Sequence, residues 1–590
     1  VRVQSGRVEV WPSLGIGRFG QPMQLRNSPR LRDALRQPQS VLLADLNGDG
    51  CADLVHFTPE GIEIFINQNG MQFADAILIR DVPPPISGTV RAANMQGQMG
   101  SGLVWNSYRG RTMAYVQLAF GNSLPYLLTT VENGSGLVSE LLYRSAVEDF
   151  ARDEAAGELW DTHFPFPYLV VAGTRERDLV SGRSTALDFN YHQAHYEPNT
   201  RQFHGFRRSE RIERSNGSLS RADVRIVFHY LMGQERLPGN GLEHAALNGM
   251  LHRSETYSLD GSPDQNRPYR TEVSEYGLSV LGMLPDGRKR SFVFVAKHRL
   301  EDTERTNTGD LRGEEKTYTY DANGNVTKEQ HRGYGTHAGV AQPERKRTSE
   351  ISYANSTTAW LLDRASRIVV RDEAGALLSE TRRYYDGPDF VGLPLGQTVR
   401  GLLSREEALV LLQAEFDAHY AGMNAATLGY AASNDVDGHL ALFTQTGRCA
   451  YNTHGVKTAI QDELGNTSAY EHDADQLFRI KLTDAAGVTQ FAFDRAIGQP
   501  TRIAYADGTQ AQFAYDAQGR VTATALPGES LADAPRQYRY DDANVPHARI
   551  AQLRFAPGAA GLAQAVAYFD GGGKEVQQRA ETQGGDRKSV

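Results

Sequence analysis

The feature that most constrains this chain is a short motif that recurs through its second half. The motif is an aromatic residue, an aspartate or asparagine, two variable residues and a glycine. Examples are YTYDANGNVT (318–327), YNTHG (451–455), YDAQGRVTATALPG (515–528) and YFDGGGK (568–574). Asp, Asn and Gly favour tight turns, and the aromatic and apolar residues around them favour strands. The recurrence predicts stacked β-hairpins in one continuous sheet, in which no single hairpin has to be stable alone.

A second and longer repeat lies near the N-terminus. VEVWPSLGIGRF (8–19) aligns with IEIFINQNGMQF (62–73) at a constant offset of 54 residues, which pairs Phe19 with Phe73. A repeat of this length is typical of a propeller blade. Each copy alternates apolar and polar residues, as a half-buried strand does. We therefore predict consecutive blades in this part of the chain.

The two repeats together predict an all-β chain with minor helical insertions. We expect a partial β-propeller with FG-GAP/VCBS-like blades over 1–130, an irregular β-rich region over 131–300, and a repeat shell over 301–590. One helix is expected inside the shell, over 404–421, because Ser404 and Glu407 have capping-box spacing and apolar residues follow at helical intervals.

Composition excludes several classes of protein. The 590 residues are 40% hydrophobic and 23% charged, which is close to the globular average and excludes disordered and collagen-like chains. A net charge of −9 without basic clusters argues against nucleic-acid binding. No run of about 18 apolar residues predicts a helical membrane span. Two cysteines, Cys51 and Cys449, cannot form a disulfide framework. Residues 1–20 start with Val and lack an apolar signal core, so we expect the sequence to begin inside a longer polypeptide.

Seven longer segments, in order along almost the whole chain, carry a resemblance to a known family. They are VWPSLGIGRFGQP (10–22), LADLNGDGCADLVHF (43–57), IFINQNG (64–70), FPFPYLVV (164–171), YHQAHYEPNTRQFHGFRR (191–208), YYDGPDFVGLPLGQ (384–397) and YFDGGGKEVQQ (568–578). The chain resembles the B component of bacterial toxin complexes (Tc toxins). That group includes large insecticidal toxins and shares its middle portion with plasmid virulence protein B.

The resemblance implies a secreted, non-catalytic component. In the family, a propeller docks onto the pore-forming A component. A sheet of YD (Rhs) repeats, joined to that of the C component, closes into a cocoon that holds the toxic effector. Relative to that pattern, we expect both the propeller and the cocoon to be incomplete in this sequence. Two motifs of relatives with enzymatic activity, Glu-x-Glu and Asp-Pro, do not occur in this sequence.

Two other classes of function compete with this one. The alternative is a cell-surface binding or carbohydrate-recognition protein, because propellers and YD repeats also occur in wall-associated proteins. A glycosidase would need a pair of carboxylates that converge at one pocket. No such pair stands out in the sequence.

The strongest candidate for bound chemistry is the segment DLNGDGCAD. It places Asp45, Asn47, Asp49 and Asp53 at positions 1, 3, 5 and 9, and the Cys51 carbonyl adds a further oxygen, as calcium prefers. The alternative is a turn of the same shape that is held by side-chain-to-backbone hydrogen bonds without metal. The equivalent positions of the next loop (94–102) hold no carboxylate, which argues against calcium there.

Two weaker candidates are interpreted as structural. His192, His195 and the nearby His204 suggest zinc, but residues three apart on a strand point to opposite faces, which prevents a shared site. The Asp and Tyr residues of the YD motif recur at each turn. A catalytic pair is used once, whereas Asp capping a turn and Tyr packing on a sheet are needed in every hairpin.

Overall fold

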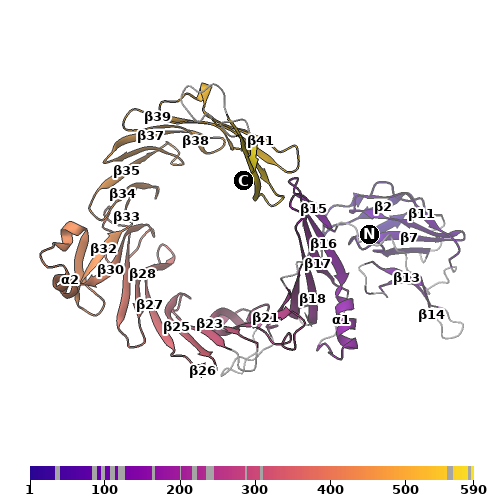
Figure 1. Ribbon diagram of the computed structural model, residues 1–590. Coiled ribbons are helices and arrows are strands. Elements are labelled where there is room, and N and C mark those ends of the chain that lie inside the picture. The colour runs from indigo at the N-terminus through magenta and orange to yellow at the C-terminus, as the bar shows by residue number, and fades with distance from the viewer. Residues whose placement is uncertain are drawn as a thin grey trace. The chain divides into compact units, whose positions relative to one another are not determined.

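The computed structural model describes residues 1–32, 40–82, 90–94, 97, 100–106, 113–116, 127–161, 167–198, 201–215, 222–233, 245–285, 287, 289–305, 310–553, 563–581 and 587–589. These residues divide into two compact units. The first comprises Val1–Val131, Ser139–Arg175 and Ala186–Ile212, and the second comprises Glu132–Val138, Glu176–Thr185 and Glu213–Val590. Strands dominate both units, so the predicted all-β class is confirmed (Figure 1).

The N-terminal part of the first unit consists of small antiparallel sheets. Their strands are β1 (Arg2–Gln4), β2 (Arg7–Val10) and β5 (Met23–Gln24); β3 (Ser13–Gly15) and β4 (Arg18–Phe19); β6 (Val41–Ala44), β7 (Asp53–Thr58), β8 (Gly61–Phe65) and β11 (Ile77–Ile79); β9 (Asn67–Gln68) and β10 (Gln72–Phe73); and β12 (Val90–Ala93), β13 (Gly102–Asn106) and β14 (Met113–Val116). In the four-stranded sheet each strand pairs with the next, in the order β6, β7, β8, β11.

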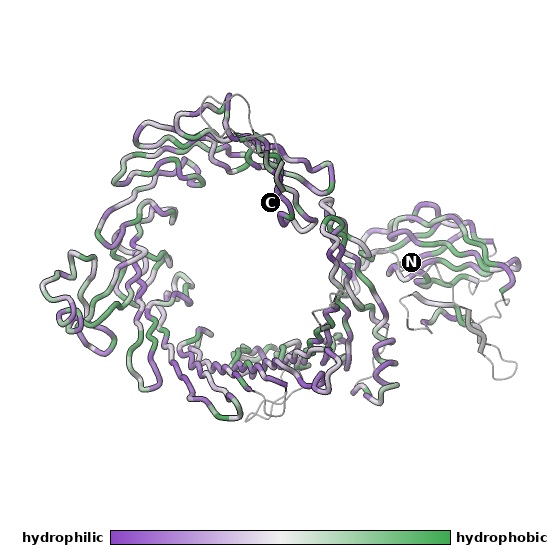
Figure 2. The backbone as a smooth tube through the Cα atoms, viewed as in Figure 1, coloured by the Kyte–Doolittle hydropathy of each residue, from purple (hydrophilic) through white to green (hydrophobic). Residues whose placement is uncertain are grey.

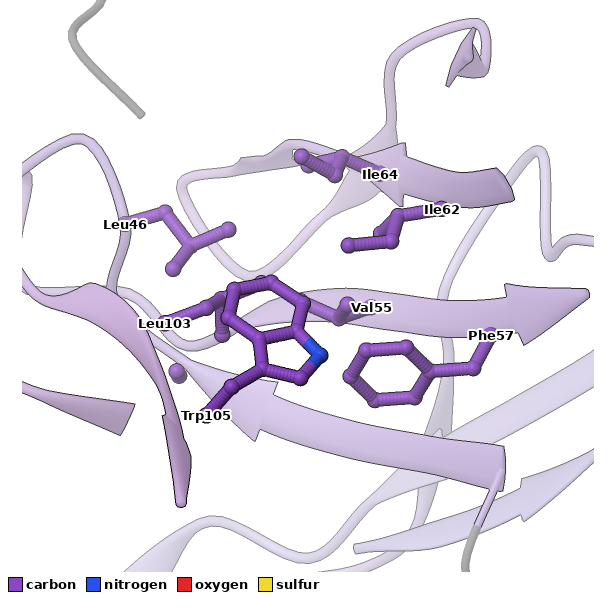
Figure 3. Packing of buried hydrophobic residues seen from close by; sticks show 8 residues of the cluster. Leu46, Val55, Phe57, Ile62, Ile64, Leu103 and Trp105 are labelled. Carbon is purple, nitrogen blue, oxygen red and sulfur yellow. The ribbon is translucent and has the colours of Figure 1, made fainter. Parts of the chain in front are cut away.

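Two apolar clusters form the core of this region. One contains Val55, Ile62, Ile64, Leu103 and Trp105, all at most 4% exposed (Figure 3). The other packs side chains of the first 54-residue repeat against the second; its buried members are Val8, Leu25, Leu31, Leu54, Phe65 and Phe73. Burial of this kind explains the alternation in the sequence, because each strand turns one set of side chains inward.

The longest sheet runs through eighteen strands of the described chain, each paired antiparallel with a neighbour that is close in sequence. They are β15 (Thr130–Glu132), β16 (Leu137–Ser145), β17 (Leu169–Asp178), β18 (Ser184–Glu197), β19 (Gln202–Arg214), β20 (Asp223–Tyr230), β21 (Leu251–Leu259), β22 (Arg270–Met283), β23 (Lys289–Thr303), β24 (Leu311–Tyr320), β25 (Val326–His337), β26 (Val340–Ala341), β27 (Arg345–Ser356), β28 (Leu361–Arg371), β29 (Leu377–Tyr385), β30 (Leu403–Leu412), β31 (Tyr430–Asn434) and β32 (Leu440–Thr446). Its first strands contribute residues to both units.

A second sheet of thirteen described strands continues the same up-and-down order. They are β33 (Arg448–Tyr451), β34 (Lys457–Gln461), β35 (Thr467–His472), β36 (Arg479–Asp484), β37 (Gly487–Asp494), β38 (Gln499–Ala504), β39 (Gln510–Tyr515), β40 (Val521–Ala525), β41 (Arg536–Asp541), β42 (Ala548–Leu553), β43 (Ala563–Phe569), β44 (Glu575–Glu581) and β45 (Arg587–Ser589). The hairpin stacking that the YD motif predicts is therefore confirmed.

Hydrophobic and hydrophilic residues alternate along these strands (Figure 2). Many strands of the two sheets are only half-buried; in β23 every residue after the first two is of intermediate exposure. Such a strand is not sandwiched between two packed layers. Cross-strand side-chain pairs and the hydrogen-bonded ladder therefore stabilise it more than a deep core does.

Helices are few and short. The helix α1 (Ala146–Ala155) follows β16 and begins with a capping box between Ser145 and Glu148. The helix α2 (Gln413–His419) follows β30, and 3₁₀ turns occur at Ala245–Leu247, Ala425–Leu428 and Leu531–Asp533. None of the helices in the described part of the chain has the length and apolarity that crossing a bilayer requires.

The predicted helix over 404–421 is correct only in its second half. Residues 403–412 form strand β30, which pairs with β29 and β32, so strand pairing overrides the helical pattern. The predicted cap is also wrong. The Ser404 hydroxyl donates to the Asp386 carbonyl at 2.8 Å, and Glu407 accepts from the Tyr384 hydroxyl at 2.9 Å.

Candidate functional site

The predicted calcium loop lies between β6 and β7 and is wound around the Asp45 carboxylate. Asp45 Oδ1 accepts hydrogen bonds from the backbone N–H of Gly48 at 2.7 Å and of Asp49 at 3.2 Å, and Oδ2 accepts from Gly50 N–H at 2.9 Å. Gly48 and Gly50 have φ values of 79° and 84°, a region in which glycine is unstrained. The glycines thus let the backbone fold around the carboxylate.

Hydrogen bonds from the side chains of Asn47 and Asp49 to neighbouring residues hold the middle of the loop. Asn47 Oδ1 accepts from Asp49 N–H at 3.1 Å, and Asn47 Nδ2 donates to Asp49 Oδ2 at 3.1 Å. Asp49 Oδ1 accepts from Cys51 N–H at 2.7 Å. Burial, and then the charge of Asp49, raise the pKa of the Cys51 thiol. These bonds use the same oxygens that a cation would need.

Asp53 connects the loop to the rest of the first unit. Its side chain is fully buried, with Oδ2 accepting from Leu46 N–H at 3.0 Å and Oδ1 from Asn67 N–H at 2.8 Å. Burial raises the pKa of Asp53 to about 6; the two backbone bonds oppose the shift, and the charges of Asp49 and Asp45 add to it. Asp53 therefore links the loop to the strand β9, with one carboxylate oxygen bonded on each side.

The five predicted ligands therefore form one turn, but their carboxylates do not gather around a common point. Among the described residues, one group of three acidic, His or Cys side chains has its ligand atoms within 4.8 Å of one another, and it does not include Asp45, Asp49 or Asp53. The hydrogen bonds fit the metal-free alternative. Calcium at this loop stays a prediction. Part of the following loop (95–96 and 98–99) lies outside the described residues.

That group is Asp153, Glu158 and His192, in the first unit. Asp153 and His192 are 3% and 6% exposed. The His192 Nδ1 atom lies 2.8 Å from Asp153 Oδ2. That same oxygen accepts from the Trp160 indole N–H at 2.8 Å, and Asp153 Oδ1 accepts from the Arg152 guanidinium at 3.0 Å. Asp153 is therefore already fully hydrogen-bonded.

Arginines neutralise the other acids around this group. Glu158 accepts from Arg208 at 2.7 Å, and the buried Asp149 accepts from both Arg144 and Arg152. A divalent cation would have to displace these guanidinium groups, so the arrangement is an ion-pair network. The network connects α1 to strand β18 through His192, and the segment after α1 to strand β19 through Arg208. Buried pairs of this kind are costly to break because one charge is left uncompensated.

His192 and His195 have different neighbours, and the absence of a shared zinc site stays a prediction. The His195 ring lies 5.5 Å from that of His204, whereas His192 faces Asp153. Sequence reasoning missed the acidic partner. The available signal was the spacing of Asp149 and Asp153 by four residues, which places both on one face of a helix.

The Asp of the YD motif caps its own turn in repeat after repeat. Its Oδ1 accepts from the backbone N–H two and four residues ahead: at 2.8 and 2.9 Å for Asp321, 3.0 and 2.8 Å for Asp462, and 3.0 and 2.9 Å for Asp516. The pKa of the Asp516 carboxyl is lowered, chiefly by the backbone bond from Arg520. The structural interpretation of these aspartates is confirmed.

The Tyr of the motif binds the neighbouring strand. The Tyr hydroxyl donates to a backbone carbonyl of a strand or strand end earlier in the sequence. The pairs are Tyr320 to Val295 (2.8 Å), Tyr385 to Ala365 (2.8 Å), Tyr451 to Leu403 (2.8 Å), Tyr515 to Pro500 (2.7 Å) and Tyr540 to Val521 (3.0 Å). The motif therefore joins each hairpin to an earlier one while closing its own turn.

Buried carboxylates in the second unit are also paired. Glu380 is 0% exposed and accepts from Arg382 at 2.6 Å and from Val436 N–H at 2.7 Å. Glu407 accepts from the Tyr384 hydroxyl and from Gln445. Neither side chain is a free carboxylate that lines a pocket, as the acid or base of a glycosidase has to be.

Comparison with known proteins identifies two parts of the chain. Residues 66–233 match the family described as the insecticide toxin TcdB middle/N-terminal region, and residues 493–530 match the RHS repeat. No curated protein matches the chain. The family resemblance predicted from the sequence is thereby confirmed.

Solved structures share the fold. The crystal structure of TcdB2-TccC3 superposes with a TM-score of 0.82 at 18% identity, over 99% of this chain and 36% of that chain. The Photorhabdus luminescens Tc holotoxin pore gives a TM-score of 0.81 at 18% identity, over 98% of this chain and 36% of that chain. The chain thus spans little more than a third of the length of the chains it matches.

Proposed function

Because the chain carries the TcdB middle/N-terminal region and an RHS repeat, we propose that it is part of the B component of a secreted bacterial Tc toxin complex. In this role it is non-catalytic. Its YD sheets form part of a hollow shell that encapsulates a toxic effector, and its N-terminal blades dock to a pore-forming component. The observation that carries the proposal is the fold likeness to TcdB2-TccC3, which covers 99% of the chain.

The exposure of the sheets supports a shell. In β22 and β23 no residue is buried, although both strands are long and fully paired. A long sheet whose faces are only half-covered can act as a wall that contacts solvent or an enclosed chain. The mixed apolar and polar side chains along these strands suit weak contact with an unfolded cargo (Figure 2).

The proposed partners are an effector-bearing C component and a pore-forming A component. The TcdB2-TccC3 structures and the Tc holotoxin pore, which have this fold, support both. Encapsulation is tested by producing the chain together with a candidate C component and treating the purified complex with protease. We expect co-elution and a protected effector region, with the same effector produced alone as the control. Separate elution, or equal digestion in both samples, would overturn the shell.

Residues 1–130 are proposed to be propeller blades. The support is the 54-residue repeat together with the up-and-down sheet β6, β7, β8, β11. Phe73 is 3% exposed because it packs in the cluster between the two repeats, whereas Phe19, at the equivalent position, is 63% exposed. A neighbouring blade would cover Phe19 as the first repeat covers Phe73.

Docking to the A component is tested at the hairpin formed by β3 and β4. Its tip presents Leu14 (68% exposed) and Ile16 (fully exposed), and exposed apolar groups of this kind favour protein contacts. We expect Ile16→Asp to weaken binding to an A component roughly tenfold or more, because a buried unpaired charge costs at least 1.4 kcal/mol. Leu428→Asp in the second unit is the matched control. Equal binding by both variants would exclude this hairpin.

Calcium at Asp45, Asn47, Asp49, Cys51 and Asp53 is a separate proposal. Binding would require Asp45 to exchange its N–H bonds for metal contacts. The test is a melting curve with calcium and with chelator, because a ligand at a hundred times its Kd adds about 2.7 kcal/mol to the stability. A higher melting temperature with calcium, lost in Asp45→Ala, supports the site. An unchanged melting temperature removes it.

A further inference from the structure

The last YD-type turn of the chain, at Phe569–Lys574, differs from the others in what it touches. Asp570 caps it in the usual way, accepting from Gly572 N–H at 3.1 Å and Lys574 N–H at 2.8 Å. Gly571, however, is buried. Its N–H and its carbonyl both bond to side chains from much earlier in the chain.

Those side chains belong to two turns, here called the receptor turns. One covers residues 133–137, where β15 leads into β16, and the other covers residues 178–182, where β17 leads into β18. Asn133 Nδ2 donates to the Gly571 carbonyl at 2.6 Å, across 438 residues of sequence. Asp178 Oδ1 accepts from Gly571 N–H at 3.1 Å, across 393 residues. All of these residues lie in the second unit. One peptide unit is therefore held at both of its polar groups.

The receptor turns are held by hydrogen bonds of their own, apart from those to Gly571. Leu179 N–H donates to the Gly136 carbonyl at 2.8 Å and joins the two turns. Asn133 and Asp178 each accept N–H bonds within their own turns, so their side chains are fixed in place. Asp178 is only 7% exposed. A rigid pair of polar groups in a buried position makes a specific contact for one peptide.

Glycine is required at 571 by this contact and not by the turn. A Cβ atom there would lie 2.4 Å from Leu137 N and 2.6 Å from the Gly136 carbonyl carbon, so the backbones are too close for any side chain. The equivalent position carries a side chain in other turns of the same kind. It is Ala322, Glu463 and Ala517 in the turns capped by Asp321, Asp462 and Asp516.

We propose that Gly571 and the receptor turns form a built-in fastening, which ties the last strands of the second sheet to the first strands of the eighteen-stranded sheet within one chain. The fastening needs no partner protein. It joins two sheets that share no strand pairing across the described residues. It therefore fixes how the end of the repeat array lies against its beginning, and it holds whether or not the proposed toxin function is correct.

The test uses hydrogen exchange on the full chain without partners. Gly571→Ala should raise amide exchange in the receptor turns roughly tenfold or more, as expected when two ordinary hydrogen bonds are lost from a local opening. Gly572→Ala is the matched control, because its Cβ would lie 3.5 Å from Asp570 Oδ1 and meet no atom of the receptor turns. We expect the control to exchange like the unchanged protein.

A second variant covers the case in which Gly571→Ala fails to fold. Asn133→Asp keeps the oxygen that caps its own turn and removes the N–H donor to Gly571, so exchange should rise in peptides that cover 570–574. Unchanged exchange in either folded variant, or the same rise in the Gly572→Ala control, would overturn the fastening. The assay contains no toxin partner, so its failure would leave the proposed complex untouched.

Discussion

The strands β7 and β23 show two ways of stabilising a β-sheet in one chain. Residues 53–57 of β7 are all buried, and side chains on both faces pack into the clusters around Leu54 and Val55. In β23, two and a half times as long, no residue is buried. The first region depends on a core. The second depends on ladder hydrogen bonds, capped turns and the bonds of the YD tyrosines.

The YD repeats therefore do not need a compact apolar interior to be stable. A core residue contributes through the apolar area that it removes from water. A YD hairpin contributes through its Asp cap and, where the aromatic residue is Tyr, through the hydrogen bond of that hydroxyl.

The largest effect is expected in the core. Leu54→Ala should lower the free energy of unfolding of the first unit by roughly 2–5 kcal/mol, because Leu54 is 0% exposed and its removal leaves a cavity. Urea unfolding followed through the buried Trp105 measures it. Leu482→Ala, in the half-buried strand β36, is the matched change and should cost less than half as much. Equal losses would contradict the comparison.

The buried side chain of Asp53 makes the first unit sensitive to pH. Its folded pKa of about 6 lies above the usual 3.8, so between these values the folded state binds a proton that the unfolded state does not. Stability should therefore fall as pH rises from about 4 to 6, by roughly 1–3 kcal/mol. Urea midpoints across this range measure the slope. In Asp53→Asn the slope should flatten, and an unchanged slope would assign it to other groups.

A turn cap should matter less. Asp516→Ala removes the acceptor for Gln518 N–H and Arg520 N–H, and we expect a loss of roughly 1–2 kcal/mol. Hydrogen exchange in peptides that cover 515–525 locates the loss. The control is Asp475→Ala, an exposed partner of Arg495, which should change stability by less than about 0.5 kcal/mol. A loss in the control as large as that in Asp516→Ala would mean that charge, and not capping, stabilises the turns.

The smallest effect is expected from a single tyrosine hydroxyl. Tyr320→Phe keeps the ring and removes the bond to the Val295 carbonyl, which should cost roughly 0.5–1.5 kcal/mol. Exchange of β23 amides is the readout. Tyr505→Phe, with a ring that is 39% exposed, provides the control. If both variants behave alike, the YD tyrosines act by packing alone.

Much of the fold could be predicted from the sequence, because its signals are local. The YD turns could be located from Asp321, Asp462 and Asp516 together with the glycines that follow them, since a turn is encoded within five residues. The 54-residue repeat is visible in the alignment of Phe19 with Phe73, and its interpretation as propeller blades stays a prediction. The helix expected at 404–421 failed at its first half because the pairing of β30 with distant strands is not written in its own residues.

The candidate site was predicted in part. The residues of the Asp45 loop are correctly placed on one turn, but the sequence could not show that Asp53 points to Leu46 and Asn67. The network of Asp153 and His192 joins residues 39 apart, on a helix and a strand. Contacts of this kind depend on how elements pack, which one sequence without homologues does not reveal.

The hydrogen bonds of the YD tyrosines all run to carbonyls earlier in the chain, which affects how the protein can fold while it is synthesised. Tyr320, Tyr385, Tyr515 and Tyr540 reach carbonyls between 15 and 25 residues earlier in the chain. Each new hairpin therefore finds its docking carbonyl on polypeptide that has already left the ribosome. Such an array of hairpins can fold from its N-terminal end, because its contacts are local in sequence and each hairpin pairs with the one before it. A long, half-buried sheet can then fold without first collapsing around a core.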